Sequence, residues 1–234
     1  MDSIYIVMPA YNEEDNIESV VKEWYPLLSD KGDTSRLVVA DAGSIDRTHK
    51  ILKDLQKEYP KLMILPDTLK QHGPKLIALY RYAISQKADY IFQTDSDGQT
   101  DPAEFALFWE NRHRYDAIIG CRRERGDGKA RAIVEDTVCF LLWCYFGIKI
   151  PDANAPFRLM RTELVDRYIG RFKPDYDIPN IMLTTFFAYY GENIAFKRIS
   201  FRARSRGKNS VNMKKIFKSG WKALGDFARF RRDI

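Results

Sequence analysis

Short apolar segments alternate with helix-like segments along the first 120 residues, and this alternation constrains the fold more than any other feature. Segments such as "SIYIVMPA" (residues 3–10) and "SRLVVAD" (residues 35–41) are nearly continuous apolar runs, and each is followed by a stretch that reads as a helix. Apolar strands that alternate with helices are typical of a mostly parallel sheet with helices on both faces. We therefore expect an α/β, Rossmann-like fold.

The pattern assigns most of the chain to elements. Strands are expected at residues 3–10, 35–41, 61–65, 89–94 and 116–120, and helices at 11–28, 44–59, 74–86 and 102–112. Asn12 is the expected N-cap of the first helix. After residue 120 the alternation breaks, and we expect helices at 131–146, 162–168 and 179–190 and short strands at 157–160 and 193–201. A chain of 234 residues with 45% hydrophobic content can bury one sizeable core.

The basic charge is concentrated at the end of the chain. Residues 201–234 hold eleven Lys or Arg and two Asp, a local charge of +9, whereas the whole chain carries +6. This surplus predicts an anionic partner, either a membrane surface or nucleic acid. Apolar side chains recur there at three- and four-residue intervals: Met213, Ile216, Phe217, Trp221, Leu224, Phe227 and Phe230. A basic amphipathic helix at 213–234 fits a membrane interface, or it docks on its own domain or in an oligomer contact.

No apolar run in the sequence approaches the length of a membrane-spanning helix. The longest, residues 138–148, is about half of the roughly 20 residues required. The N-terminal apolar stretch has no basic region before it, which disfavours a secretory signal. We expect a cytoplasmic protein that is peripheral on the inner face of the cell membrane.

Three polar loops follow predicted strands and are expected to share one crevice. They are "PAYNEEDN" after the first strand, "ADAGSID" after the second and "TDSDGQTDP" after the fourth. Ligands of open α/β sheets bind beyond the carboxyl ends of the strands. None of the loops is a glycine-rich phosphate cradle, which disfavours a dinucleotide dehydrogenase or a P-loop enzyme.

The third loop has two parts. Asp101, followed by Pro102 and by Glu104 three residues after the cap, is a helix-start signature. The other part offers oxygen ligands suited to Mg²⁺ or Mn²⁺, from Asp95, Asp97 and Gln99. On residue types alone, a metal site and a polar turn are both open.

The ordered set of motifs resembles a known family. "VMPAYNEEDNI", "VVADAGSIDRT", "TDSDGQTDP", "GCRR", "DANAPFRLMR" and "RSRGKNS" occur in the order and approximate spacing of the family-2 glycosyltransferases with the GT-A fold, across residues 3–212. The sequence is most similar to the branch with dolichyl-phosphate mannose synthase and bacterial polyprenyl-phosphate sugar transferases. This resemblance implies a GT-A domain at 1–212, with a nucleotide-sugar-binding half at 1–120 and an acceptor half at 121–212, before the helix at 213–234.

The resemblance also implies roles for individual residues. The donor nucleotide is expected at Pro9, Ala10, Tyr11, Glu13, Asp41, Lys75, Asp95 and Ser96. A divalent metal, Mn²⁺ or Mg²⁺, is expected at Asp95, Asp97 and Gln99. Ala42 stands where the family usually has a second aspartate, so a UDP-sugar and a GDP-sugar both remain open as donor. Ser44 and Asp46 either cap the second helix or touch the ligand.

The expected catalytic residues are Asp97 and Asp152. Asp97 would help to stabilise the charge of the leaving diphosphate, and Asp152 would act as a general base if the acceptor is a hydroxyl. A phosphate acceptor needs no base. Cations for an acceptor or phosphate are expected at Arg122, Arg131, Arg158, Arg204 and Lys208. The apolar helix after Arg131 packs in the core or lines a groove for a lipid chain.

The expected function is a metal-dependent, inverting transfer of a sugar from a nucleotide sugar to a lipid phosphate, or to another lipid-linked acceptor, at the cytoplasmic membrane face. One alternative is transfer to a glycan hydroxyl in surface polysaccharide synthesis. A sugar-1-phosphate nucleotidyltransferase is a weaker alternative, because its usual glycine-rich basic loop is absent. A nucleic-acid-binding scaffold is disfavoured by the aspartate pair and by the spacing of aromatics in the tail. An oligomer is left open.

Overall fold

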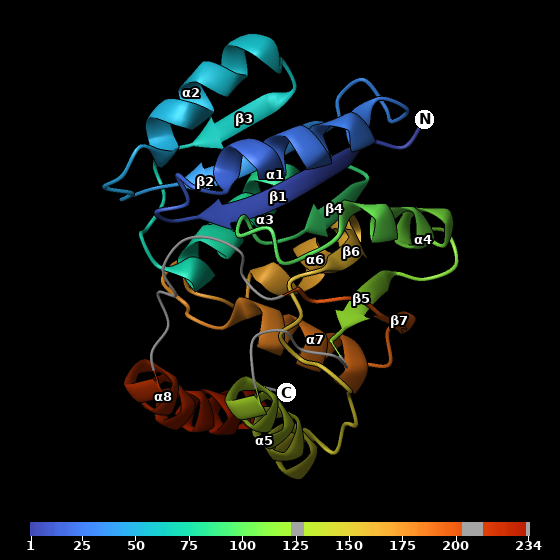
Figure 1. Ribbon diagram of the computed structural model, residues 1–234. Coiled ribbons are helices and arrows are strands. Elements are labelled where there is room, and N and C mark those ends of the chain that lie inside the picture. Colours follow the sequence, from blue (N-terminus) through green and yellow to red (C-terminus); the bar gives the residue numbers. More distant parts are fainter. Residues whose placement is uncertain (123–128, 203–212, 233–234) are drawn as a thin grey trace.

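A single seven-stranded sheet runs through the protein (Figure 1). The computed structural model describes residues 1–122, 129–202 and 213–232, and for residues 129–131 and 213–222 it gives the backbone alone. The strand order is β3-β2-β1-β4-β6-β5-β7. The strands contributed by the two expected halves therefore belong to one continuous sheet.

The first four strands are parallel to one another. They are β1 (Ile4–Ala10), β2 (Arg36–Asp41), β3 (Leu62–Leu65) and β4 (Tyr90–Gln93). Every residue of β1 is buried, as the continuous apolar run predicted. Ala10 at the end of β1 lies beside Asp41 at the end of β2, so the first two polar loops leave the sheet at the same edge.

Among the remaining strands, one runs antiparallel to the rest of the described sheet. They are β5 (Ala117–Cys121), β6 (Arg158–Arg161) and β7 (Ile194–Arg198). β6 lies antiparallel between β4 and β5, whereas β5 and β7 are parallel. The carboxyl end of β5 therefore points to the same edge as those of β1, β2 and β4. The prediction of a mostly parallel α/β sheet is confirmed.

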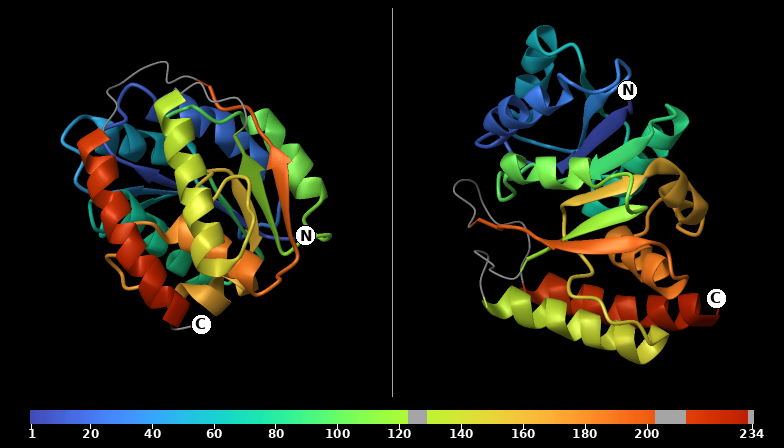
Figure 2. Two further views of the ribbon diagram at one scale, coloured as in Figure 1. Left: turned by 90° about the horizontal axis from the view of Figure 1, so that it is seen from below. Right: turned by 90° about the vertical axis from the view of Figure 1, so that its right-hand side faces the viewer.

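Helices cover both faces of the sheet. One face carries α1 (Ile17–Trp24), α2 (Thr48–Glu58) and α4 (Phe105–Glu110), with short 3₁₀ turns at Tyr25–Leu28 and Pro102–Glu104. The other carries α3 (His72–Ser85), α6 (Thr162–Ile169) and α7 (Pro179–Tyr189). Beyond α7, α5 (Lys129–Phe146) and α8 (Met213–Arg232) lie side by side (Figure 2).

The first helix begins later than the sequence predicted. Asn12 is not its N-cap: the residue adopts a left-handed backbone with φ of 54°, and the cap is Asn16. The carbonyl of Glu13 accepts hydrogen bonds from the backbone N–H groups of Asn16 and Ile17, at 2.9 and 2.8 Å. Residues 11–13 therefore leave β1 as a loop, and a hydrogen-bonded turn at residues 14–16 leads into α1.

The helix start at Asp101 is confirmed, although the reciprocal capping bond is not formed. The Asp101 side chain accepts a hydrogen bond from the N–H of Ala103 at 3.0 Å, with Pro102 next to it. The Glu104 carboxylate instead accepts from the N–H of Ser200, at 2.9 and 3.2 Å. Glu104 thus ties this turn to the segment that follows β7.

The described end of α8 docks on the protein. Phe227 is 0% and Phe230 4% exposed. Phe227 contacts the rings of Tyr145 and Phe146 on α5, and Phe230 contacts Phe186 on α7. Of the two alternatives for this helix, docking on its own domain is therefore confirmed for these two side chains, and their expected contact with a membrane is wrong. None of the helices in the described ranges is long and apolar enough to cross a membrane.

Candidate active site

The three polar loops meet at the carboxyl edge of the sheet, as predicted. The backbone N–H of Asn12 donates to the Ser44 hydroxyl at 3.0 Å, and the Asn12 side chain accepts from the N–H of Ile45 at 2.9 Å. The hydroxyl of Ser96, in the third loop, donates to the carbonyl of Pro9 at 2.8 Å. Side chains from the loops after β1, β2 and β4 therefore form one polar surface.

Asp41, the expected contact for the nucleotide base, is held in place by neighbours. It is 4% exposed, accepts from the Ser44 hydroxyl, and lies 3.2 Å from His49 Nδ1 through its second oxygen. Burial acts to raise the pKa of Asp46, but hydrogen bonds from the Thr48 hydroxyl and from the N–H of Thr48, the latter at 3.0 Å, prevail and lower it. Asp46 thus supports the start of α2, and Ser44 supports Asp41 and the first loop.

Lys75 on α3 lies beneath the first loop. It is 1% exposed, its Nζ donates to the carbonyl of Ala10, and the ammonium lies 5.4 Å from the centre of the Tyr11 ring. A second ammonium, of Lys70, lies 4.7 Å from the same ring. Burial lowers the pKa of Lys75 to about 8, against the opposing pull of Asp41. The charge that orients Tyr11 is therefore easier to remove than that of an exposed lysine.

The aspartate pair follows β4 at a sharp turn. Gly98 has φ of 73°, a backbone conformation that favours glycine, and the N–H of Gln99 donates to Asp97 Oδ1 at 3.1 Å. The Gln99 amide donates to the carbonyl of Arg202 at 2.7 Å, so the loop is joined to the chain after β7. No group of three or more His, Cys, Asp or Glu side chains that could hold a metal occurs among the described residues. Gln99 as a ligand remains a prediction.

His72 was not predicted, and it lies beside Asp95. Its Nε2 is 3.3 Å from Asp95 Oδ1, and the histidine side chain is 56% exposed. Gly73 allows this placement, because a Cβ there would lie 2.3 Å from the carbonyl oxygen of Asp177. The start of α3 is thus pressed against the loop before α7, which aims His72 at the crevice. No motif in the sequence signals this contact.

The acceptor-side residues form a buried ion-pair cluster. The Arg122 guanidinium donates two bonds to Asp152, at 2.8 and 2.9 Å, and lies 3.3 Å from Glu135 on α5. The Arg122 side chain is 6% exposed and that of Asp152 2%. Burial opposes the charge of Arg122, but the bonds to Asp152 prevail and raise its pKa. The predicted base and the predicted phosphate contact are therefore bound to each other.

The role predicted for Arg158 is wrong. We expected it to bind the acceptor or a phosphate, but it is 0% exposed and donates to backbone carbonyls of Ala155, Ala153 and Asn180. Burial lowers its pKa. Arg158 supports the loop that carries Asp152 from inside the protein, where an acceptor has no access.

Three predicted cations remain beyond structural description. Arg204 and Lys208 lie outside the described residues, and for Arg131 the backbone is described but the side chain is not.

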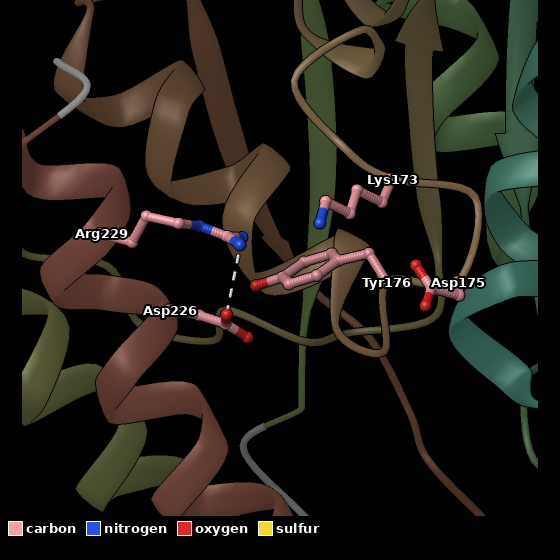
Figure 3. A pocket seen from close by; sticks show the side chains of 5 residues that line it. All are labelled: Lys173, Asp175, Tyr176, Asp226 and Arg229. Atoms are coloured by element: carbon pink, nitrogen blue, oxygen red, sulfur yellow. Dashed lines mark ion pairs between the residues drawn. The ribbon is translucent and has the colours of Figure 1, made fainter.

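A small pocket lies elsewhere, between α8 and the loop before α7 (Figure 3). It encloses about 180 Å³ and is lined by Lys173, Asp175, Tyr176, Asp226 and Arg229. None of the predicted site residues lines it. Its two acids and two bases balance, so its charge favours neither an anion nor a cation. The polar surface at the sheet edge, which carries the family motifs, is the better candidate.

The model of the family described as Glycosyl transferase family 2 matches residues 5–169, more than half of the chain. The chain belongs to glycosyl transferase family 2. The matched range includes the three loops, the aspartate pair and the ion-pair cluster of Arg122 and Asp152.

Similar proteins agree with this membership. An uncharacterised glycosyltransferase of Synechocystis sp. is 29% identical over 69% of this chain and 51% of its own length. The undecaprenyl-phosphate 4-deoxy-4-formamido-L-arabinose transferase of Edwardsiella ictaluri is 23% identical over 69% and 50%. The dolichyl-phosphate beta-glucosyltransferase of Dictyostelium discoideum is 26% identical over 71% and 57%. The chain thus spans about half the length of these relatives.

A solved structure confirms the GT-A-like fold of this family 2 member. Glucosyl-3-phosphoglycerate synthase from Mycobacterium tuberculosis, in complex with Mn²⁺, UDP-glucose and glycerol 3-phosphate, superimposes with a TM-score of 0.70. The match covers 100% of this chain and 81% of that one, at 20% sequence identity. At this identity, the similarity establishes the architecture alone.

Proposed function

We propose that this protein transfers a sugar from a nucleotide sugar, UDP- or GDP-linked, to a lipid phosphate or another lipid-linked acceptor. One observation carries the proposal: the loops after β1, β2 and β4 join into a single polar surface that includes Asp41, Asp95 and Asp97. Relatives named as undecaprenyl-phosphate and dolichyl-phosphate sugar transferases support a lipid-phosphate acceptor. Inversion at the anomeric carbon is part of the proposal.

Asp95 and Asp97 fit a divalent metal. They lie in one turn after β4, and the Asp95 side chain is 25% exposed, which leaves it accessible to an ion. Two carboxylates suit Mn²⁺ or Mg²⁺, which usually complete their coordination with water and substrate phosphates. When bound, such an ion would stabilise the negative charge that develops on the leaving diphosphate. Solved neighbours in complex with Mn²⁺ or Mg²⁺ and UDP support this choice.

The donor-side residues would bind and orient the nucleotide. Tyr11 offers a ring for the base or ribose, and Lys75 holds that ring and the carbonyl of Ala10 from beneath. Asp41 is 4% exposed and both of its oxygens have partners, Ser44 and His49, so its proposed hydrogen bond with the base would replace one of these contacts. Pro9, Glu13 and Ser96 belong to the same surface and complete the proposed donor set. The proposed division places donor binding in residues 1–120 and the acceptor in residues 121–212.

The state of Asp152 favours a phosphate acceptor over a hydroxyl. A general base must be free to take a proton from the acceptor. Asp152 is 2% exposed and accepts two bonds from Arg122, so its oxygens are occupied and are not open to an acceptor hydroxyl. A phosphate is already anionic near neutral pH and needs no base. Transfer to a glycan hydroxyl remains the second candidate, and Asp152 would have to leave this ion pair for it.

The outer face of α5 supports action at a membrane. Ile133, Phe140 and Trp143 are 65%, 58% and 47% exposed, and the two rings lie 5.9 Å apart. The neighbouring α8 adds exposed Arg231 and Arg232. Exposed aromatic side chains, together with basic residues on a neighbouring helix, suit an anionic membrane interface. We propose that this surface, rather than the buried rings of α8, approaches the membrane at its cytoplasmic face.

The donor proposal is tested with a panel of UDP- and GDP-sugars, measured for Mn²⁺-dependent binding and turnover. A polyprenyl phosphate serves as acceptor, and Asp97→Ala is compared with the parent. We expect one donor to bind with Mn²⁺ and to be turned over, with turnover lowered about a hundredfold or more in the variant, because a charge-stabilising group is lost. If no nucleotide sugar binds, or if the variant matches the parent, the transferase proposal fails.

The membrane proposal is tested by vesicle flotation. We expect the parent to float with anionic phospholipid vesicles and the double variant Phe140→Ser, Trp143→Ser to remain in the soluble fraction. Leu107→Ser is the matched control, since Leu107 is 45% exposed but lies on α4, across the sheet. Equal flotation of the double variant and the parent would refute a role for α5.

A further inference from the structure

A chain of buried polar side chains ends at Asp95. The Tyr80 hydroxyl on α3 donates to Asn180 Oδ1 at 2.7 Å, and Asn180 Nδ2 on α7 donates to Gln93 Oε1 at 3.0 Å. Gln93, the last residue of β4, donates from Nε2 to Asp95 Oδ1 at 3.4 Å. Tyr80 and Gln93 are 0% exposed and Asn180 is 2% exposed. Three polar side chains of the core are thus connected to a residue of the proposed metal site.

The hydrogen bonds run in one direction. An amide side chain has a donor end and an acceptor end, so a bond at one end decides which end faces the next residue. Burial raises the pKa of Tyr80, so its phenol keeps the proton that it donates to Asn180. Asn180 then turns its NH₂ to Gln93, and Gln93 turns its NH₂ to Asp95. The Asp95 carboxylate consequently meets a donor instead of a carbonyl oxygen.

The same asparagine also contacts the acceptor side. The backbone carbonyl of Asn180 accepts from Arg158, whose guanidinium also holds Ala153 and Ala155 in the loop after Asp152. Apolar side chains in these positions would avoid the free-energy cost of burying polar groups. Packing of the core therefore does not explain why these positions are polar. Orientation of the Asp95 carboxylate does explain it. Hydrogen bonds from outside the coordination shell commonly orient metal ligands.

We propose that Gln93, Asn180 and Tyr80 are positioning residues that orient the Asp95 carboxylate for a divalent cation. The inference rests on the proposed function, because it takes Asp95 as a metal ligand. The three residues act through Asp95, and each sets the orientation of the next.

The test uses Mn²⁺ as the probe, titrated into the full chain with and without UDP or GDP, while electron paramagnetic resonance measures free Mn²⁺. Gln93→Met removes the donor to Asp95, and we expect about tenfold weaker Mn²⁺ binding. Tyr80→Phe removes a hydroxyl that does not contact Asp95, and we expect about fivefold weaker binding, the effect of one lost hydrogen bond. The variant Asp95→Asn shows how much of the measured Mn²⁺ binding depends on the Asp95 carboxylate.

Thr185→Val is the matched control. Thr185 is 0% exposed on the same helix as Asn180, and its hydroxyl donates to the carbonyl of Ile181, away from the polar chain. We expect parental Mn²⁺ affinity for this variant, even if its melting temperature falls. Melting curves identify any variant that does not fold, and if Gln93→Met is one of them, Tyr80→Phe decides.

Two results would overturn the inference, and they differ. If the parent binds Mn²⁺ and the folded Gln93→Met and Tyr80→Phe variants bind it equally well, the positioning role is wrong while the metal site stands. If the parent binds no Mn²⁺ with either nucleotide, the metal-dependent function and the inference fail together.

Discussion

The two sides of the crevice hold their carboxylates differently. On the donor side, the Asp95 side chain is 25% exposed and that of its neighbour His72 is 56% exposed. On the acceptor side, Asp152 and Arg122 are 2% and 6% exposed and share a bidentate ion pair. An accessible carboxylate keeps oxygen lone pairs for a ligand, whereas a buried pair uses them to hold the fold. We therefore expect Asp95 to serve binding, whereas Asp152 and Arg122 hold the fold; Asp41, on the donor side but 4% exposed, is held by neighbours as Asp152 is.

The comparison is tested most strongly by Arg122→Met. This change leaves Asp152 buried without its main cationic partner, and breaking one side of a buried pair typically costs about 3–5 kcal/mol. We expect the free energy of unfolding, measured by urea denaturation, to fall by about that amount. A decrease below about 1 kcal/mol would show that the pair resembles an exposed one.

Removing both members of the pair is the control for Arg122→Met. The double variant Arg122→Met, Asp152→Leu leaves no unpaired buried carboxylate at position 152, so we expect it to be more stable than Arg122→Met alone. If the double variant is less stable than the single one, the loss comes from packing of the arginine side chain and not from the unpaired charge.

The donor side should respond to pH through Lys75. Its pKa is lowered by burial to about 8, so raising the pH from 7 to 9.5 removes the charge that holds Tyr11 and the carbonyl of Ala10. We expect about fivefold weaker binding of the donor nucleotide at the higher pH, the effect of one weakened charged contact. Isothermal titration calorimetry over this range measures it.

Lys75→Met separates this effect from other titrations. The variant should bind the nucleotide weakly at both pH values. Its affinity should not show the fall between pH 7 and pH 9.5 that loss of the Lys75 charge causes in the parent. A parental pH dependence in the variant would contradict the role of Lys75. The sign for stability is the reverse: the unfolded chain keeps the Lys75 proton up to its ordinary pKa of 10.5, so the unfolding free energy rises with pH above about 8.

The open side of the crevice was largely predictable from sequence, because its residues follow strands. Apolar runs located β1, β2 and β4, and the parallel arrangement then brought the loops with Asp41 and Asp95 to one edge. The start of α1 was misplaced because Asn12 adopts a left-handed turn that its residue type permits but does not require.

The closed side was less predictable, because long-range pairing decided it. Arg122 and Asp152 are 30 residues apart, and Arg158 reaches Asn180 across another 22. A sequence motif does not show whether its basic residue faces solvent or is buried against backbone carbonyl groups. Burial, which separates the two cases, depends on how α5 and α7 pack. The contact of His72 with Asp95 and the hydrogen-bonded chain from Tyr80 to Gln93 were not predicted for the same reason, because they too depend on long-range packing.

Asp152→Asn tests whether the closed side takes part in proton transfer. With a phosphate acceptor there is no proton to remove, so we expect turnover within about threefold of the parent, far from the loss of about 10²–10⁴ typical of a missing general base. Initial rates with a polyprenyl phosphate measure it. A loss of a hundredfold or more at unchanged nucleotide affinity would favour the hydroxyl-acceptor alternative and a base role for Asp152.

The smallest effect is expected for the exposed ion pair of the donor side. Arg47 Nε lies 3.0 Å from Glu14 Oε2, and the arginine side chain is 77% exposed, so water already solvates the charge. Arg47→Met should leave the midpoint of urea denaturation unchanged, in contrast to Arg122→Met under the same conditions. The glutamate also accepts from the backbone N–H of Arg47 at 3.2 Å, a bond that the substitution preserves. A shift as large as that of Arg122→Met would mean that ion pairs stabilise both sides of the crevice alike, and burial would no longer explain the difference between them.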